Sequence, residues 1–65
     1  MENLTIIWLN NFGENIHKFS SNGDVKVTIN GFVTEEFNFG IKDAFIFQSQ
    51  LLKALRKQNI DFVIE

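Results

Sequence analysis

Few residues in this chain belong to the types that carry out catalysis, and His17 is the only histidine. An imidazole can act as a general base when a hydroxyl or a carboxylate lies within hydrogen-bond reach. Ser20, Ser21 and Asp24 follow His17 closely, but neither a nucleophile elbow nor a triad pattern accompanies them. We therefore expect His17 to be a structural or solvent-facing residue and not a catalytic one.

Glu35 and Glu36 are adjacent carboxylates, and paired carboxylates can serve as a general acid and a general base. Adjacent residues of a strand point to opposite faces, so these two cannot act together without a local bulge. The two Asn-Gly pairs lack the spacing, the lysine and the strand-to-helix context of a phosphate-binding loop. The sequence therefore predicts a protein that is not an enzyme.

Composition narrows the remaining classes of function. The 65 residues include no cysteine, so neither a disulfide nor a thiolate metal site can form, and we expect no cofactor. A net charge of −2 is too small to indicate a nucleic-acid partner. The apolar runs fall far short of the ~20 residues that a helix needs to cross a bilayer. The acidic start of the sequence lacks the basic n-region that is typical of a secretory signal peptide. We expect a cytoplasmic protein that does not enter a membrane.

The order of the secondary-structure elements can be read from the spacing of apolar and turn residues. Residues 25–30 alternate between apolar and polar side chains, as a half-buried strand does. Asn22-Gly23 before them and Asn30-Gly31 at their end are Asn-Gly pairs, which are typical of type I′ hairpin turns. Apolar residues at helical spacing predict a helix over residues 40–59, with acidic Asp43 in its first turn and basic residues near its end. The other predicted strands are residues 4–9, 16–20, 32–39 and 60–65.

These elements predict a single α+β domain over residues 1–65, in which a small, mostly antiparallel β-β-β-β-α-β sheet carries one amphipathic helix on one face. The first strand is apolar on both faces, which favours an interior position next to the last strand. A right-handed crossover could place the last strand parallel to a strand of the meander or to the first strand.

One helix is about 10 Å wide and can cover only part of one sheet face. The opposite face is expected to show Ile7, Leu9 and Val63, joined by Phe19 or Ile16 from the short second strand and by Phe32. An apolar patch with a polar rim is typical of an association surface. The alternatives are that loops fold over this face, or that a few apolar side chains stay exposed, as is common in soluble proteins.

The predicted helix has two residues that do not fit its amphipathic pattern. Ile46 falls among Lys42, Lys53 and Lys57 on the polar face, where it could anchor a partner that the lysines steer. Gln48 falls within the apolar face, where it could contact a bound ligand. The alternative is an isolated exposed isoleucine, or a helix rotated so that Gln48 emerges.

The sequence thus favours a non-enzymatic protein-interaction module that forms homo-oligomers. Its eight asparagines and eight isoleucines are typical of an AT-rich genome, which suggests a small phage or bacterial regulator, for example an inhibitor of a host enzyme or defence system. Its partner is then a second copy or a larger protein target. The alternative function is small-ligand binding in a Phe-lined pocket between helix and sheet or between subunits.

Overall fold

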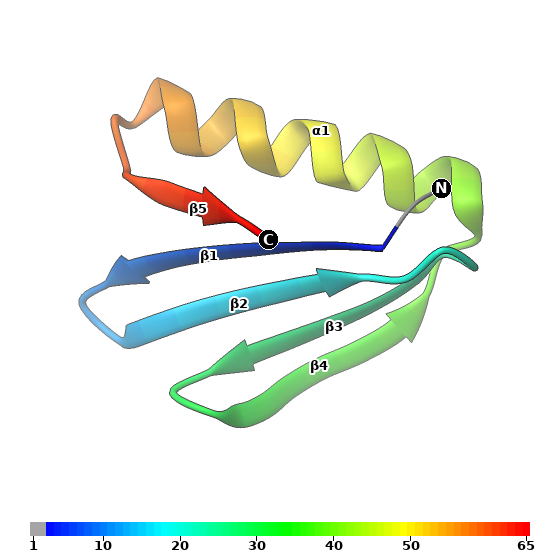
Figure 1. Ribbon diagram of the computed structural model, residues 1–65, viewed down its shortest axis with the longest axis horizontal. Coiled ribbons are helices and arrows are strands. Elements are labelled where there is room, and N and C mark those ends of the chain that lie inside the picture. Colours follow the sequence, from blue (N-terminus) through cyan, green and yellow to red (C-terminus); the bar gives the residue numbers. More distant parts are fainter. Residues whose placement is uncertain (1–2) are drawn as a thin grey trace.

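The computed structural model describes residues 3–65 and shows five strands and one helix (Figure 1). The elements are β1 Leu4–Asn10, β2 Gly13–Phe19, β3 Asp24–Ile29, β4 Phe32–Asn38, α1 Ile41–Lys57 and β5 Phe62–Ile64. The strands form one sheet in the order β4-β3-β2-β1-β5, and each neighbouring pair is antiparallel. This confirms the predicted α+β class and the position of the last strand beside the first.

The β1–β2 hairpin has a turn of only two residues, because Asn10 pairs directly with Gly13. We expected a longer loop here. The Asn30 side chain, from the β3–β4 turn, stabilises the tight turn by accepting a hydrogen bond from the Glu14 N–H (3.0 Å) and donating one to the Phe12 carbonyl (2.7 Å). The short turn extends β2 backwards to Gly13 and fixes the register of the first two strands.

The two Asn-Gly pairs form different turns. Asn30 and Gly31 both have positive φ, 53° and 84°, as the predicted type I′ hairpin requires. In the β2–β3 turn only Gly23 is left-handed, with φ 92°, and its N–H donates to the Ser20 carbonyl (3.0 Å). This is a longer hairpin loop that closes on a left-handed glycine, so the expectation of a type I′ turn at Asn22 is wrong.

The end of α1 determines the direction of β5. Asn59 adopts φ 55° just after the helix, the Ile60 N–H donates to the Leu55 carbonyl (3.0 Å), and the Asn59 N–H donates to that of Arg56 (3.1 Å). These two bonds are the Schellman pattern of a helix C-terminus, and they turn the chain back toward the sheet. β5 therefore runs in the direction of β4, as one alternative predicted, and antiparallel to its neighbour β1, so the other alternative is wrong.

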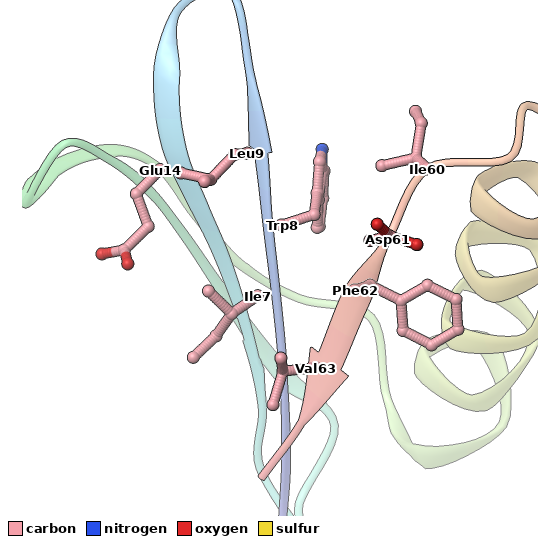
Figure 2. Close-up of a pocket in the computed structure, with 8 residues that line it drawn as sticks. All are labelled: Ile7, Trp8, Leu9, Glu14, Ile60, Asp61, Phe62 and Val63. Atoms are coloured by element: carbon pink, nitrogen blue, oxygen red, sulfur yellow. The ribbon is translucent and has the colours of Figure 1, made fainter.

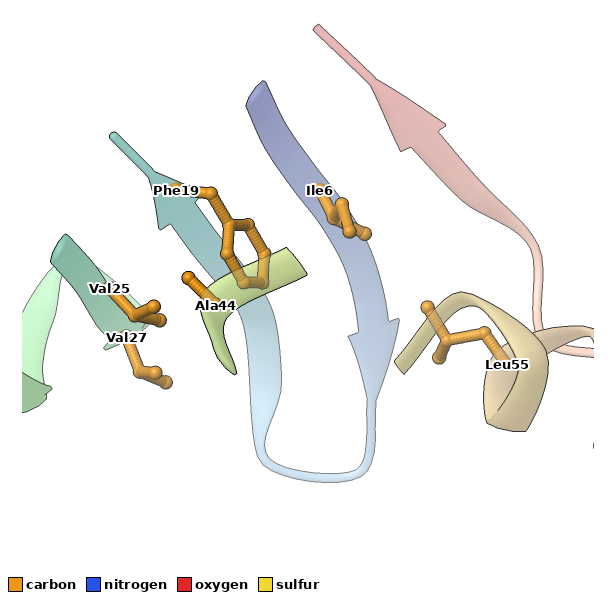
Figure 3. Close-up of a cluster of buried hydrophobic side chains, with 6 residues drawn as sticks. All are labelled: Ile6, Phe19, Val25, Val27, Ala44 and Leu55. Atoms are coloured by element: carbon orange, nitrogen blue, oxygen red, sulfur yellow. The ribbon is translucent and has the colours of Figure 1, made fainter. Parts of the chain in front are cut away.

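The core lies between α1 and one face of the sheet. Ala44 and Leu55, from opposite ends of α1, point toward buried side chains of β1, β2 and β3 (Figure 3). Ile41 and Phe45 share the helical spacing of the apolar residues but are about half exposed. The buried apolar side chains are Ile6, Phe19, Val25, Val27, Ala44 and Leu55. This core is small, and all of it lies on one side of the sheet.

Over the described residues 3–65, the 17-residue α1 has neither the length nor the apolar character to cross a membrane.

Candidate protein-interaction surface

The register of the sheet brings one side chain from each strand into a row on the face without a helix. Residues that pair across antiparallel strands point to the same face, and residues two apart along a strand share that face. The row runs across all five strands in the order Val63, Ile7, Ile16, Thr28 and Val33. We call it the bare-face row. Four of its five members are aliphatic, and the fifth is a threonine.

Figure 2 shows the two sides of the sheet at β1 and β5. Ile7, Leu9 and Val63 point away from α1, whereas Trp8 and Phe62 point toward it. This confirms the faces predicted for the first and last strands. Leu9 lies two residues after Ile7 on the same face and widens the apolar surface there.

The bare-face row is accessible to a partner. Within the row, Val63 and Val33 are 58% and 52% exposed, and Ile7 and Ile16 are half-buried; Leu9, beside the row on the same face, is 71% exposed. A row with four aliphatic side chains and one threonine across a sheet differs from scattered exposed apolar residues, which are normal on soluble proteins. No loop of the described residues buries these side chains, so the expectation that loops might cover them is not met.

Two residues predicted for this surface lie elsewhere. Phe19 is 2% exposed and belongs to the core, because it pairs with Leu4 and Val25 on the side of α1. Ile16 takes its place on the bare face, as the alternative prediction allowed. Phe32 is 77% exposed, but it pairs with Ile29 and by register lies on the helix side of the sheet.

Val33 is a member of the surface that the sequence did not reveal. In a regular strand it would share a face with Glu35, two residues further on. The β3–β4 register shifts between Val27 and Thr28, so that Val33 pairs with Thr28 while Glu35 pairs with Val27. This bulge moves Val33 to the bare face and leaves Glu35 on the helix side. No glycine or proline within β4 marks the bulge in the sequence.

Charged side chains line both sides of the bare-face row. On β2, Glu14 and Lys18 stand two residues before and two residues after Ile16. Lys18 pairs directly with Lys26, and Lys26 pairs with Glu36 on its other side. Like charges directly opposite each other destabilise a sheet, and the cross-strand neighbours of Lys18 include no carboxylate.

The helix residues singled out from the sequence are separated from this surface. Ile46 is 46% exposed, and the three lysines around it are exposed. Together with Phe39, Asp43, Phe47 and Gln50, Ile46 lines an open groove of about 300 Å³. Gln48 is half-buried and lines neither this groove nor the one at β5. The lysines are Lys42, Lys53 and Lys57.

A larger groove of about 600 Å³ lies where β1 extends beyond the short β5. Its lining is mainly apolar, with two carboxylates from different segments, Glu14 and Asp61. The apolar part includes Trp8, Leu9 and Phe62, so that the groove begins on the bare face and continues around the sheet edge. It is therefore continuous with the bare-face row.

His17 lies on the helix side of the sheet within a cluster of aromatic rings. Its ring centroid is 4.8 Å from that of Trp8 and 5.9 Å from that of Phe47. Its Nδ1 is buried and has no hydrogen-bond partner among the described residues. Burial lowers the pKa of His17 below its ordinary value of 6.5, and the Glu35 carboxylate offsets part of this effect. This environment fits a neutral structural imidazole, as the sequence predicts.

The lowered pKa of His17 has a consequence for stability. Above about pH 6.5 the imidazole is neutral in both the folded and the unfolded protein. As the pH falls through 6.5 toward the lower pKa of the folded state, the unfolded chain binds more protons, so the free energy of unfolding should decrease. The slope cannot exceed about 1.4 kcal/mol per pH unit for one group.

We expect His17→Phe to remove this dependence, since phenylalanine keeps the aromatic contacts and has no titrating group. Urea unfolding of both proteins at several values between pH 5 and pH 8 measures the difference, and the carboxylates common to both cancel. A wild-type protein that gains stability relative to the variant on acidification would show that the charged imidazole is favoured in the folded state.

Among residues 3–65, no three side chains of the metal-binding types lie close enough together to hold an ion. The fold and its surface thus define a small α+β protein with one helix, a core on one side of its sheet and an apolar row on the other. Comparisons with family models, with curated proteins and with solved structures found no match to this chain.

Proposed function

We propose that this protein is a non-enzymatic protein-interaction module that acts through the bare face of its sheet and forms homo-oligomers. The observation that carries the proposal is the bare-face row, four aliphatic side chains and one threonine across all five strands, over which residues 3–65 place no second layer. Sheets that are apolar on both faces normally have a layer on each. Here the chain supplies one layer, and a partner would supply the other.

The exposed area supports the same proposal. The chain has 4611 Å² of solvent-accessible surface, whereas a folded monomer of its 7.5 kDa mass is expected to show about 4,200 Å². A 65-residue domain has a small core, and oligomerisation is a common additional source of stability at this size. Covering the bare face would bring the protein nearer to the surface expected for its size.

Within this class, we propose a small phage or bacterial regulator, and an inhibitor of a host enzyme or defence system is one form of it. Its support is the small size, the unpaired apolar face and the composition rich in asparagine and isoleucine. Its working surface is the bare face, whether in self-association or against a larger protein.

We expect Leu9→Lys to abolish association through the bare face, because it places a charge within the apolar surface. Leu9 is 71% exposed, so the change should leave the fold intact. Phe32→Lys is the matched control, since Phe32 is 77% exposed but lies on the helix side of the sheet. Light scattering at micromolar concentration should show a monomer for the first variant and the wild-type mass for the second.

Equal loss of association in both variants would count against the bare face as the working surface. A wild-type protein that stays monomeric would refute its self-association.

The groove at β5 favours a second function, small-ligand binding. Its volume of about 600 Å³ lies within the range of about 300–1,000 Å³ usual for ligand sites. The lining combines the apolar Trp8 and Phe62 with the carboxylates of Glu14 and Asp61, a combination suited to an apolar cation. Thermal shift against a panel of nucleotides and metabolites separates the two functions: a specific ligand raises the melting temperature, whereas a pure protein binder does not respond.

A further inference from the structure

The charged residues of β2 on the bare face form a pattern that fits the same residues of a second copy. On β2, an acidic and a basic side chain, Glu14 and Lys18, lie at equal distances on either side of the apolar Ile16. Two residues along a strand span about 6.6 Å. A rotation of 180° about the bare-face row would therefore carry the position of Glu14 onto that of Lys18, and the reverse.

We infer that two copies pack face to face, related by a two-fold axis that runs along the bare-face row, with Glu14 of each copy facing Lys18 of the other. This inference rests on the proposed function and specifies its partner and register. The axis leaves the apolar row in place, so Ile7 and Ile16 of one copy meet their equivalents in the second. The arrangement is isologous, as two-fold interfaces are.

The arrangement would also place a carboxylate opposite Lys18, whose cross-strand neighbours within one chain include none. Its cross-strand neighbours are Thr5 and Lys26, and Lys26 already has Glu36 on its other side. A glutamate from the second copy would give Lys18 an opposite charge and reduce its repulsion from Lys26. Each dimer would contain this contact twice.

Two other two-fold axes would not place opposite charges of β2 against each other. An axis along β2 would bring the two Lys18 side chains together, and also the two Glu14 side chains. An axis between β1 and β2 would place Lys18 opposite Thr5 of the second copy and Glu14 opposite Leu9, without an opposite charge for either. The axis along the bare-face row is the one of the three that pairs Glu14 with Lys18.

The area of the face is large enough for a specific dimer. Five strands at a spacing of about 4.8 Å measure about 24 Å across, and β2 with its seven residues is about 20 Å long. The projected face of about 500 Å² on each copy would bury roughly 1,000 Å² in total, which is the lower limit for a specific interface. Face-packed sheets of this kind lie about 10 Å apart with their strands within about 30° of each other.

Charge reversal on β2 tests this register. Lys18→Glu and Glu14→Lys each convert two opposite-charge contacts of the dimer into two like-charge contacts, so the dimer dissociation constant should rise roughly tenfold at low salt. Combining them exchanges the two charges and should restore the wild-type constant. Sedimentation equilibrium of the full chain at low and high salt measures all four proteins, and the differences should shrink as salt increases.

Lys18→Glu should have opposite effects on the dimer and on the separate chain. In the separate chain it replaces a lysine that faces Lys26 by a glutamate, which should leave the monomer at least as stable in urea. A weaker dimer formed by a more stable monomer cannot result from damage to the fold.

The outcomes separate this inference from the proposed function. A wild-type dimer that Leu9→Lys breaks, but that neither charge reversal weakens, would overturn the register and keep the bare face as the working surface. A double variant that dimerises no better than the single ones would also overturn the register. A wild-type chain that stays monomeric would overturn both.

Discussion

Replacing Phe19 by alanine should unfold a large fraction of the protein. Phe19 is 2% exposed, and its ring lies 5.8 Å from that of Phe47 on α1. Truncation of a buried phenylalanine costs about 3–5 kcal/mol, whereas a domain of 65 residues is stable by only about 3–10 kcal/mol. Urea unfolding followed by circular dichroism should show a much lower midpoint, or no folded baseline at all.

Phe12→Ala is the matched control for this experiment. Phe12 is 76% exposed in the β1–β2 turn, and its truncation should change the free energy of unfolding by less than about 0.5 kcal/mol. The pair of variants also tests the position of Phe19. If Phe19→Ala stayed folded and lost only its association, Phe19 would belong to the interface and not to the core.

Gly23→Ala should have the second largest effect. Gly23 has φ 92°, and a Cβ there would lie 2.6 Å from the carbonyl oxygen of Gly40, in the segment that leads into α1. The two segments are also joined by a hydrogen bond from the Phe39 N–H to the Gly23 carbonyl (3.2 Å). We expect a loss of about 3 kcal/mol or more, because the left-handed backbone and the displaced helix entry both contribute.

Gly31→Ala separates these two contributions. Gly31 has a similar φ of 84°, but a Cβ there meets nothing within 4 Å. Its replacement should therefore cost only the left-handed penalty of about 1–2 kcal/mol. Equal losses in the two variants, measured by urea unfolding, would show that the contact between Gly23 and Gly40 does not help to hold α1 in place.

These two predictions concern the part of the fold that creates the bare face. The close contact of Gly23 with Gly40 and the hydrogen bond from the Phe39 N–H to Gly23 hold the start of α1 beside the β2–β3 turn. The Schellman turn at Asn59 holds the end of α1 beside β5. With both ends held, the single helix stays on one side of the sheet. On the other side, residues 3–65 form no second layer.

The elements that could be predicted from the sequence are those whose periodicity is regular. The alternation of residues 25–30 and the helical spacing of residues 40–59 identified β3 and α1, since both patterns follow from the geometry of a single element. The apolar character of residues 4–9 likewise predicted an interior strand, and β1 lies between β2 and β5. Each of these features is local.

The parts that could not be predicted depend on register. The β1–β2 turn has two residues, and a shift of one residue in a hairpin moves every side chain to the other face. Without that turn length, Phe19 and Ile16 could not be assigned to their faces. The bulge opposite Val27 and Thr28 had the same effect on Val33. The side chains predicted for the face without a helix do lie there on β1 and β5, whereas on β2 the alternative Ile16 does so and on β4 Val33 lies there in place of Phe32.

The mass of the wild-type protein in solution tests the central claim most directly. Sedimentation equilibrium from about 1 µM to about 1 mM covers dissociation constants that correspond to binding free energies of roughly −4 to −8 kcal/mol. A second copy on the bare face predicts a mass that rises with concentration toward twice the chain mass of 7.5 kDa. A mass that stays at 7.5 kDa over the whole range would contradict it.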